Sequence, residues 1–357
     1  MPKYNINWNL TRQCNLRCKH CYYEAGTQLE DELSTAECFA VLDEIAEVFG
    51  AGAGAGGEGS AGSAGARVTF GGGEALLRED LFEIISHAKE RGLHLVLASN
   101  GTLLNEEVAG RLKAAGVEEV IIPIDGTQET HDFIRGEGVF EKAVQGARAC
   151  RAAGLGLVVD PCIMKQNEAE TGRIIEIAAD LGARQCRFFH YIPMGRGKER
   201  LPADTELGSV QYAENLSLLY EEQNKRRELE ICTTQAAQYW VVLKRKAEQG
   251  LFVPEFFYNE IPGCRAATGM LSIKPNGDVV PCPLLEVKAG NLRETSLREI
   301  LNSRVFVALK NREVKGKCAE CRHKEICGGC RVRAFLNGDG DYLAEDPLCS
   351  EFFFEEL

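Results

Sequence analysis

Three cysteines near the start of the chain have the spacing of a metal-cluster site. Cys14, Cys18 and Cys21 form a C-x3-C-x2-C motif directly after a strand-like segment. A structural zinc site takes four ligands, and His20 is a poor fourth ligand because it directly precedes Cys21 in a short loop. Three thiolates can instead hold a 4Fe-4S cluster with one iron open. We therefore expect an open cluster that chelates an amino acid's amine and carboxylate and supports one-electron chemistry.

A second group of cysteines lies near the other end of the chain. Seven cysteines fall within 86 residues there. They are Cys264, Cys282, Cys318, Cys321, Cys327, Cys330 and Cys349. A zinc ribbon would use only the four from Cys318 to Cys330 and leave three unexplained. Two iron–sulfur clusters account for all seven, so we favour clusters over zinc.

Polar residues follow the next expected strands. Gly72, Gly73 and Glu74 end the run Phe70-Gly-Gly-Gly-Glu74, where the glycines allow close backbone approach. Ser99-Asn100 and Asp125 follow two later strands. In barrels of parallel strands, the carboxyl ends of the strands carry the site. We expect these side chains to gather beside the first cysteine group.

The elements that position these residues alternate between strand and helix. Short apolar runs predict strands at residues 5–10, 68–70, 94–98, 117–124, 155–163 and 185–191. Apolar residues at three- and four-residue spacing predict helices at residues 35–49, 78–91, 105–115, 140–153 and 169–181, the first capped by Ser34 or Thr35. Six such units predict an α/β fold, an open partial (β/α)6 TIM-like barrel.

The alternation stops after about Pro193, and a second region begins. Helical patterns at residues 205–225 and 234–249 are followed by a hairpin at residues 270–281, with Asn276-Gly277 in its turn. We expect a barrel at residues 1–200, a helical bridging region at 201–260, and a small C-terminal iron–sulfur domain at 261–357. Residues 50–66 are almost wholly Gly, Ala and Ser and predict a flexible surface loop.

Composition narrows the function classes further. The formal net charge is −12, and nine acids but no Lys or Arg lie between His20 and Ala66. An acidic chain without a basic stripe disfavours nucleic-acid and anionic-membrane partners. Apolar runs are too short to span a bilayer, and the N-terminus resembles no signal peptide. We expect a cytoplasmic protein, where clustered thiols bind metal or act in catalysis.

These motifs together resemble the radical S-adenosylmethionine (SAM) superfamily, which carries C-x3-C-x-aromatic-C after the first strand of a partial barrel. His20 stands at the aromatic position. The resemblance implies that Cys14, Cys18 and Cys21 hold the catalytic cluster. It further implies S-adenosylmethionine contacts from His20, Gly72, Gly73, Glu74, Ser99, Asn100 and Asp125. The chain departs from the family at Pro123, where Ser is common.

The C-terminal cysteines resemble the SPASM extension of one branch of that superfamily. By position, the resemblance assigns Cys318, Cys321, Cys327 and Cys349 to one auxiliary cluster and Cys264, Cys282 and Cys330 to the other, so the chain should hold three 4Fe-4S clusters. The spacing from Cys327 to Cys330 is x2 where the family has x3. Segments around residues 191–197, 327–335 and 340–349 resemble the haem-pathway members of the branch.

The resemblance implies an enzyme that reductively cleaves S-adenosylmethionine to a 5′-deoxyadenosyl radical and oxidises a substrate carbon. A tetrapyrrole side chain in haem or related cofactor synthesis is the favoured substrate. A peptide maturase that forms a crosslink or thioether is the first alternative, and a non-enzymatic iron–sulfur electron carrier is the second. An external one-electron donor such as flavodoxin or ferredoxin is the expected partner.

For some residues the sequence pattern does not decide between a functional and a structural role. Cys232 lies between the two regions, at the start of a helical pattern, and is either a fourth ligand of the three-cysteine cluster, a substrate contact or a buried thiol that ends a short strand. His131 and Arg135 fit a loop salt bridge as well as a ligand contact. The remaining predictions place apolar or thiol side chains in the core. These are Cys38, Cys150, Cys162, Cys186, Tyr239 and Trp240.

Overall fold

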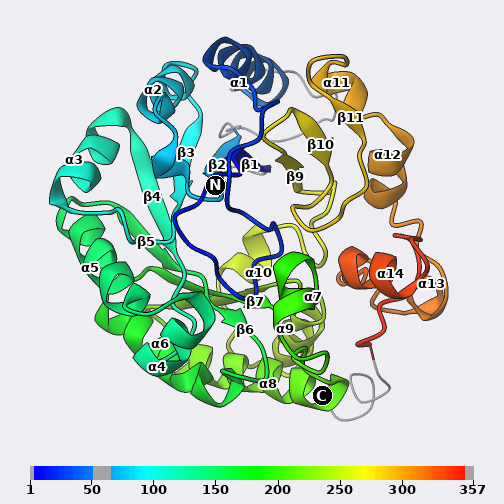
Figure 1. The fold of residues 1–357 in the computed structure, drawn as a ribbon. Helices are drawn as coiled ribbons and strands as arrows, with labels where there is room; N and C mark the ends of the chain where they lie inside the picture. The colour runs from blue at the N-terminus through cyan, green and yellow to red at the C-terminus, as the bar shows by residue number, and fades with distance from the viewer. Residues whose placement is uncertain (1–3, 51–65, 350–357) are drawn as a thin grey trace.

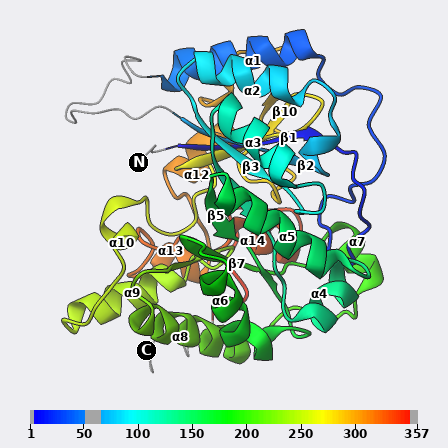
Figure 2. The ribbon, with the colours of Figure 1, turned by 90° about the vertical axis from the view of Figure 1, so that its left-hand side faces the viewer.

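The computed structural model describes residues 4–50 and 66–349, which form a curved sheet wrapped by helices (Figures 1 and 2). Most of the predicted Gly/Ala loop, residues 51–65, lies outside the described residues. The strands are β1 (Asn5–Thr11), β2 (Arg67–Gly72), β3 (His94–Ala98), β4 (Val117–Ile122), β5 (Gly156–Val159), β6 (Cys162–Ile163), β7 (Gln185–His190), β8 (Glu230–Thr234), β9 (Met270–Ile273), β10 (Asp278–Val280) and β11 (Gly290–Asn291).

Helices cover the outer face of this sheet (Figure 1). The helices of the barrel region are α1 (Thr35–Phe49), α2 (Leu81–Glu90), α3 (Glu106–Ala115), α4 (Gln128–Arg135), α5 (Val139–Ala152), α6 (Thr171–Asp180) and α7 (Gly195–Arg200). Those that follow are α8 (Ser209–Lys225), α9 (Tyr239–Glu248), α10 (Phe256–Asn259), α11 (Leu297–Ile300), α12 (Arg304–Lys310), α13 (Lys317–Glu320) and α14 (Arg331–Asn337). The described residues also contain two 3-10 turns, η1 (Ala75–Leu77) and η2 (Glu168–Glu170).

The sheet is an open barrel. Strands β1, β2, β3, β4, β5 and β7 pair in that order, all in parallel, and β8 pairs in parallel with β7. Strands β5 and β6 pair with β7 at the same offset in residue number, so they are two parts of one strand interrupted at Asp160-Pro161. At the other end β9 pairs in parallel with β1. The predicted partial barrel with a C-terminal domain is confirmed.

Some local predictions were wrong. The bridging region was expected to be helical, but it contains β8, and Cys232 lies within that strand instead of starting a helix. The segment with His131 and Arg135 is helix α4. In the hairpin β9–β10 only Gly277 has a left-handed φ, of 86°, because the loop is longer than the two-residue turn expected. The boundaries at residues 200 and 260 stay predictions.

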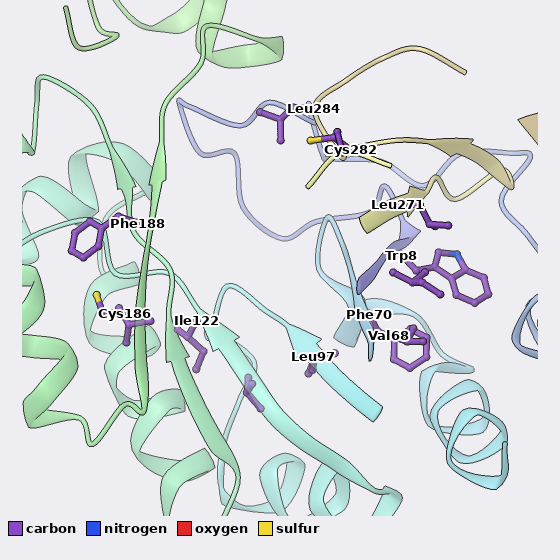
Figure 3. Packing of buried hydrophobic residues seen from close by; sticks show 14 of the residues in the cluster. Trp8, Val68, Phe70, Leu97, Ile122, Cys186, Phe188, Leu271, Cys282 and Leu284 are labelled. Carbon is purple, nitrogen blue, oxygen red and sulfur yellow. The ribbon is translucent and has the colours of Figure 1, made fainter. Parts of the chain in front are cut away.

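A continuous apolar core joins the barrel to the C-terminal region. Figure 3 shows part of it, with Trp8, Phe70 and Leu271 grouped on β1, β2 and β9. Parallel strands are covered on both faces, so their outer side chains are almost fully buried under the helices. The thiols and aromatic side chains predicted to be core residues are buried. They are Cys38, Cys150, Cys162, Cys186, Tyr239 and Trp240.

Helix α1 shows how the sequence sets a boundary. Ser34, not Thr35, is its N-cap and forms a reciprocal capping box with Glu37. Within the described residues, no helix is long and apolar enough to cross a membrane.

Candidate active site

A cavity of about 310 Å³ lies inside the barrel and is bordered by the carboxyl ends of its strands. The loop after β1 brings Cys14, Cys18 and Cys21 to its wall. The predicted cofactor-contact residues on the same wall are His20, Gly72, Gly73, Ser99 and Asn100. The structure therefore brings together the first cysteine group and most of the residues expected around it.

Arginines from distant elements hold the cysteine loop in place. Arg196 on α7 donates to the carbonyl oxygens of Cys18 and Ala25, at 3.0 and 2.6 Å. Arg135 at the end of α4 lies with Nη1 4.0 Å from the Cys18 sulfur. Both guanidinium groups line the cavity. The sequence gives no local signal for Arg196, which is 178 residues from Cys18.

Asp125 lies behind this loop, not on the cavity wall. Its carboxylate is fully buried and accepts from Arg135 Nε at 2.6 Å and from the Cys162 backbone N–H at 2.8 Å. His20 Nε2 lies 3.4 Å from the same carboxylate, and His131 Nδ1 accepts from the Asp125 N–H. Burial of the carboxyl group raises the pKa of Asp125, but the Arg135 guanidinium outweighs this effect and holds the pKa far below its ordinary value. In this structure Asp125 therefore positions Arg135 and His20.

Glu74 also lies one layer behind the cavity. Its side chain is fully buried and accepts from the Asn100 N–H at 2.8 Å, the Ser99 hydroxyl at 3.1 Å and the Leu76 N–H at 3.3 Å. No Lys, Arg or His in residues 4–50 and 66–349 forms an ion pair with it. Burial raises the pKa of Glu74 to about 7. A cationic ligand in the cavity would supply the missing positive charge.

The glycines before Glu74 are required by close backbone packing. A Cβ on Gly73 would stand 2.1 Å from the Gln13 carbonyl oxygen, and one on Gly72, where φ is +134°, 2.2 Å from the Thr11 carbonyl oxygen. The Gly73 and Glu74 N–H groups donate to the same two carbonyls. The segment is therefore fastened to the start of the cysteine loop.

The thiols of Cys14, Cys18 and Cys21 are better suited to binding a metal cluster than to remaining without a metal. Burial raises the pKa of Cys14, and raises that of Cys18 to about 11 despite the nearby Arg135 guanidinium. Each thiolate would repel the others, since Cys14 and Cys21 also raise the pKa of Cys18. Iron ions supply the positive charge that would keep all three deprotonated.

The C-terminal cysteines fall into two groups. Cys318, Cys321, Cys327 and Cys349 line one cavity of about 660 Å³. Cys282 is instead next to Cys264 and Cys330, because those two thiolates add to the burial that raises its pKa to about 12. The Cys264 N–H donates to the Cys327 carbonyl oxygen, so the groups adjoin.

The spacing of these thiols suits clusters. Among the residues that the structure describes, no three His, Cys, Asp or Glu side chains converge closely enough to hold a metal ion together. A cubane offers a separate iron to each thiolate, so its ligands stand further apart than those of one ion. Burial raises the pKa of Cys232 well above its ordinary value, and its main charged neighbours are Glu230, Arg187, Glu260 and Asp160.

Comparison with known proteins agrees with this geometry. Residues 8–178 match the family model described as the radical SAM superfamily, and residues 264–341 match SPASM, an iron–sulfur cluster-binding domain. An AdoMet-dependent heme synthase from Methanosarcina barkeri is 36% identical over 96% of this chain and 95% of its own length. This chain belongs to the radical SAM superfamily.

The predicted enzyme class, iron–sulfur clusters and S-adenosylmethionine (AdoMet) as cofactors are thereby confirmed, and the electron-carrier alternative is wrong. A Fe-coproporphyrin III synthase from Methanosarcina barkeri is 31% identical, covering 96% of this chain and 87% of its own. The mycofactocin maturase MftC of Mycobacterium tuberculosis is 30% identical, covering 96% and 82%. The solved structure of native anSMEcpe with bound AdoMet shares the fold, with a TM-score of 0.72 at 17% identity over 99% of this chain and 96% of that one.

Proposed function

We propose that this radical SAM enzyme converts propionate side chains of an iron porphyrin into vinyl groups. The main support is the greater similarity to an AdoMet-dependent heme synthase than to a peptide maturase, 36% against 30% at equal coverage of this chain. Haem carries vinyl groups at two positions where coproporphyrin III carries propionates, so an enzyme that makes haem from that precursor must oxidise those side chains.

The cysteine groups suggest which residues hold the cofactors. Cys14, Cys18 and Cys21 would hold the cluster of the barrel, Cys264, Cys282 and Cys330 one auxiliary cluster, and Cys318, Cys321, Cys327 and Cys349 the other. When bound and reduced, the barrel cluster supplies the electron that cleaves AdoMet to methionine and a hydrogen-abstracting 5′-deoxyadenosyl radical.

The surrounding residues of the chain bind and orient AdoMet in this proposal. Ser99 and Asn100 line the cavity, and Glu74 fixes them from behind while its carboxylate attracts the ammonium group. Asp125, through Arg135, sets the position of the cysteine loop.

The proposed reaction balances without an added oxidant. The side-chain carbon attached to the ring loses one hydrogen atom to the 5′-deoxyadenosyl group, giving 5′-deoxyadenosine. The bond to the carboxylate then breaks, CO₂ leaves, a carbon–carbon double bond forms and one electron is released. That electron equals the one consumed in AdoMet cleavage, so an external donor such as flavodoxin or ferredoxin is needed to reduce the enzyme but is not consumed in net terms.

The test is the product of the anaerobically reconstituted enzyme with dithionite, AdoMet and Fe-coproporphyrin III. We expect each converted side chain to lose the mass of CO₂ and two hydrogen atoms, with one 5′-deoxyadenosine formed per loss. The variant Cys14→Ala should form neither product. An unchanged porphyrin mass beside normal 5′-deoxyadenosine formation would refute the substrate and favour a peptide substrate, as the similarity to MftC would then suggest.

A further inference from the structure

Two polar side chains on the cavity wall, those of Thr234 and Gln235, belong neither to the cysteine groups nor to the predicted AdoMet contacts. Thr234 ends β8 and Gln235 follows it, and both line the cavity that contains Cys14. Thr234 Oγ1 and Gln235 Oε1 are shielded from solvent and have no hydrogen-bond partner within the described residues. A buried polar atom without a partner costs about 1–3 kcal/mol. Such atoms on a cavity wall indicate a ligand that pairs with them.

The register of β8 explains why Thr234 faces the cavity. Thr234 is the partner of Phe189 and Cys232 the partner of Arg187, and both β7 residues line the cavity. Alternate residues of a strand point to opposite faces. Thr233 is therefore turned away, and its hydroxyl donates to the Ala236 carbonyl oxygen.

Gln235 is held in a strained conformation. Its φ is +57°, in the left-handed region that residues other than glycine seldom adopt. Its carbonyl oxygen accepts from Arg333, a buried residue of α14 whose Nε also donates to Glu206 at 2.8 Å. Helix α14 starts directly after Cys330. Strain of this kind persists where surrounding contacts impose it and is concentrated at functional sites.

The neighbouring groups indicate the chemistry of the ligand. Arg187 donates to Asp160 through Nε and Nη2, at 3.1 and 2.8 Å, and no described residue accepts from its Nη1. Asn7 Nδ2 is another buried donor without a partner on this cavity. Together with the hydroxyl of Thr234, they place three donors on this wall, whereas the unpartnered Gln235 Oε1 is an acceptor. Such a wall favours an anionic oxygen ligand, above all a carboxylate.

We propose that Thr234 and Arg187 bind a propionate carboxylate of the porphyrin and so orient the side chain that is oxidised. This assignment rests on the proposed function. Thr234 is a specificity residue in this view, and AdoMet cleavage in the absence of porphyrin does not depend on it.

The experiment measures binding of Fe-coproporphyrin III and of its tetramethyl ester to the reconstituted holoenzyme by absorbance titration. Thr234→Val should weaken binding of the acid by about 10- to 100-fold. Thr233→Val, which removes the same hydroxyl from the opposite face, is the matched control and should leave porphyrin binding unchanged.

The ester separates carboxylate recognition from a general packing effect. Wild type should bind the ester as weakly as Thr234→Val binds the acid, and Thr234→Val should lose nothing more on the ester. Uncoupled AdoMet cleavage and the cluster EPR spectra should match wild type. Two outcomes overturn the carboxylate site but not the proposed function. In the first, Thr234→Val loses equal affinity for the acid and for the ester. In the second, it loses no affinity for the acid although wild type converts the acid. Failure of wild type to bind or convert the acid overturns the proposed function.

Discussion

Glu74 is a buried carboxylate without a cationic partner in the described part of the chain, and AdoMet carries the positive charge that this position lacks. Burial holds the pKa of Glu74 at about 7, so the group is neutral below that pH and ionised above it. Because the cationic ligand favours the ionised form, AdoMet affinity should be highest above pH 7 and fall as the pH falls through 7.

The size of this effect follows from the fraction of ionised Glu74. With a pKa of about 7, roughly nine-tenths of the carboxyl groups are ionised at pH 8 and roughly one in thirty at pH 5.5. If the attraction is lost on protonation, affinity falls about 30-fold across this range, or about 2 kcal/mol. Glu74→Gln should bind AdoMet weakly at both pH values and show none of this dependence.

The assay is anaerobic calorimetric titration of reconstituted wild type and Glu74→Gln with AdoMet from pH 5.5 to 8. The amino group of AdoMet also titrates in this range, but equally for both proteins, so the ratio of their dissociation constants isolates Glu74. We expect that ratio to rise about 30-fold toward pH 8. A ratio that is constant with pH would show that the charge of Glu74 has no part in AdoMet binding.

Three further changes test the supports of the site. Asp125→Ala should destabilise the metal-free protein by about 3–5 kcal/mol in denaturant unfolding, because it leaves the Arg135 guanidinium, whose side chain is only 11% exposed, without its carboxylate partner; a loss below about 1 kcal/mol would contradict this. Gly73→Ala should abolish AdoMet binding, since its Cβ meets a backbone carbonyl of the cysteine loop, whereas Gly110→Ala in α3 meets open space and should bind normally. Cys232→Ala should leave the EPR spectra of the auxiliary clusters unchanged, and a changed spectrum would return this thiol to the ligand set.

The fold could be predicted from the sequence where apolar residues recur with a regular period. Helix α1 and strand β3 have their predicted boundaries because the apolar spacing is regular and a Ser–Glu capping box marks the helix start. Strand β8 was missed because its cavity face carries Cys232 and Thr234, so it lacks the apolar character of a buried parallel strand. Its place in the sheet comes from pairing with β7, a contact that no short window contains.

Some residues of the site could also be predicted from short sequence patterns, whereas others are brought together only by folding. The cysteine groups could be predicted because cluster ligands recur at short, fixed spacings. Arg135 lies 117 residues from Cys18, and Arg333 lies 98 residues from Gln235, so their contacts arise only when the chain folds. Glu74 and Asp125 lie behind the cavity, where each carboxylate accepts hydrogen bonds from its own neighbours, and their direct contacts with the cofactor stay predictions.

We propose that this enzyme abstracts hydrogen from a propionate side chain of an iron porphyrin. The most direct measurement uses Fe-coproporphyrin III deuterated at the side-chain carbons attached to the ring, followed by mass spectrometry of the 5′-deoxyadenosine formed. We expect one deuterium in each 5′-deoxyadenosine and a matching vinyl group in the porphyrin. Unlabelled 5′-deoxyadenosine, formed in the presence of the bound porphyrin, would contradict it.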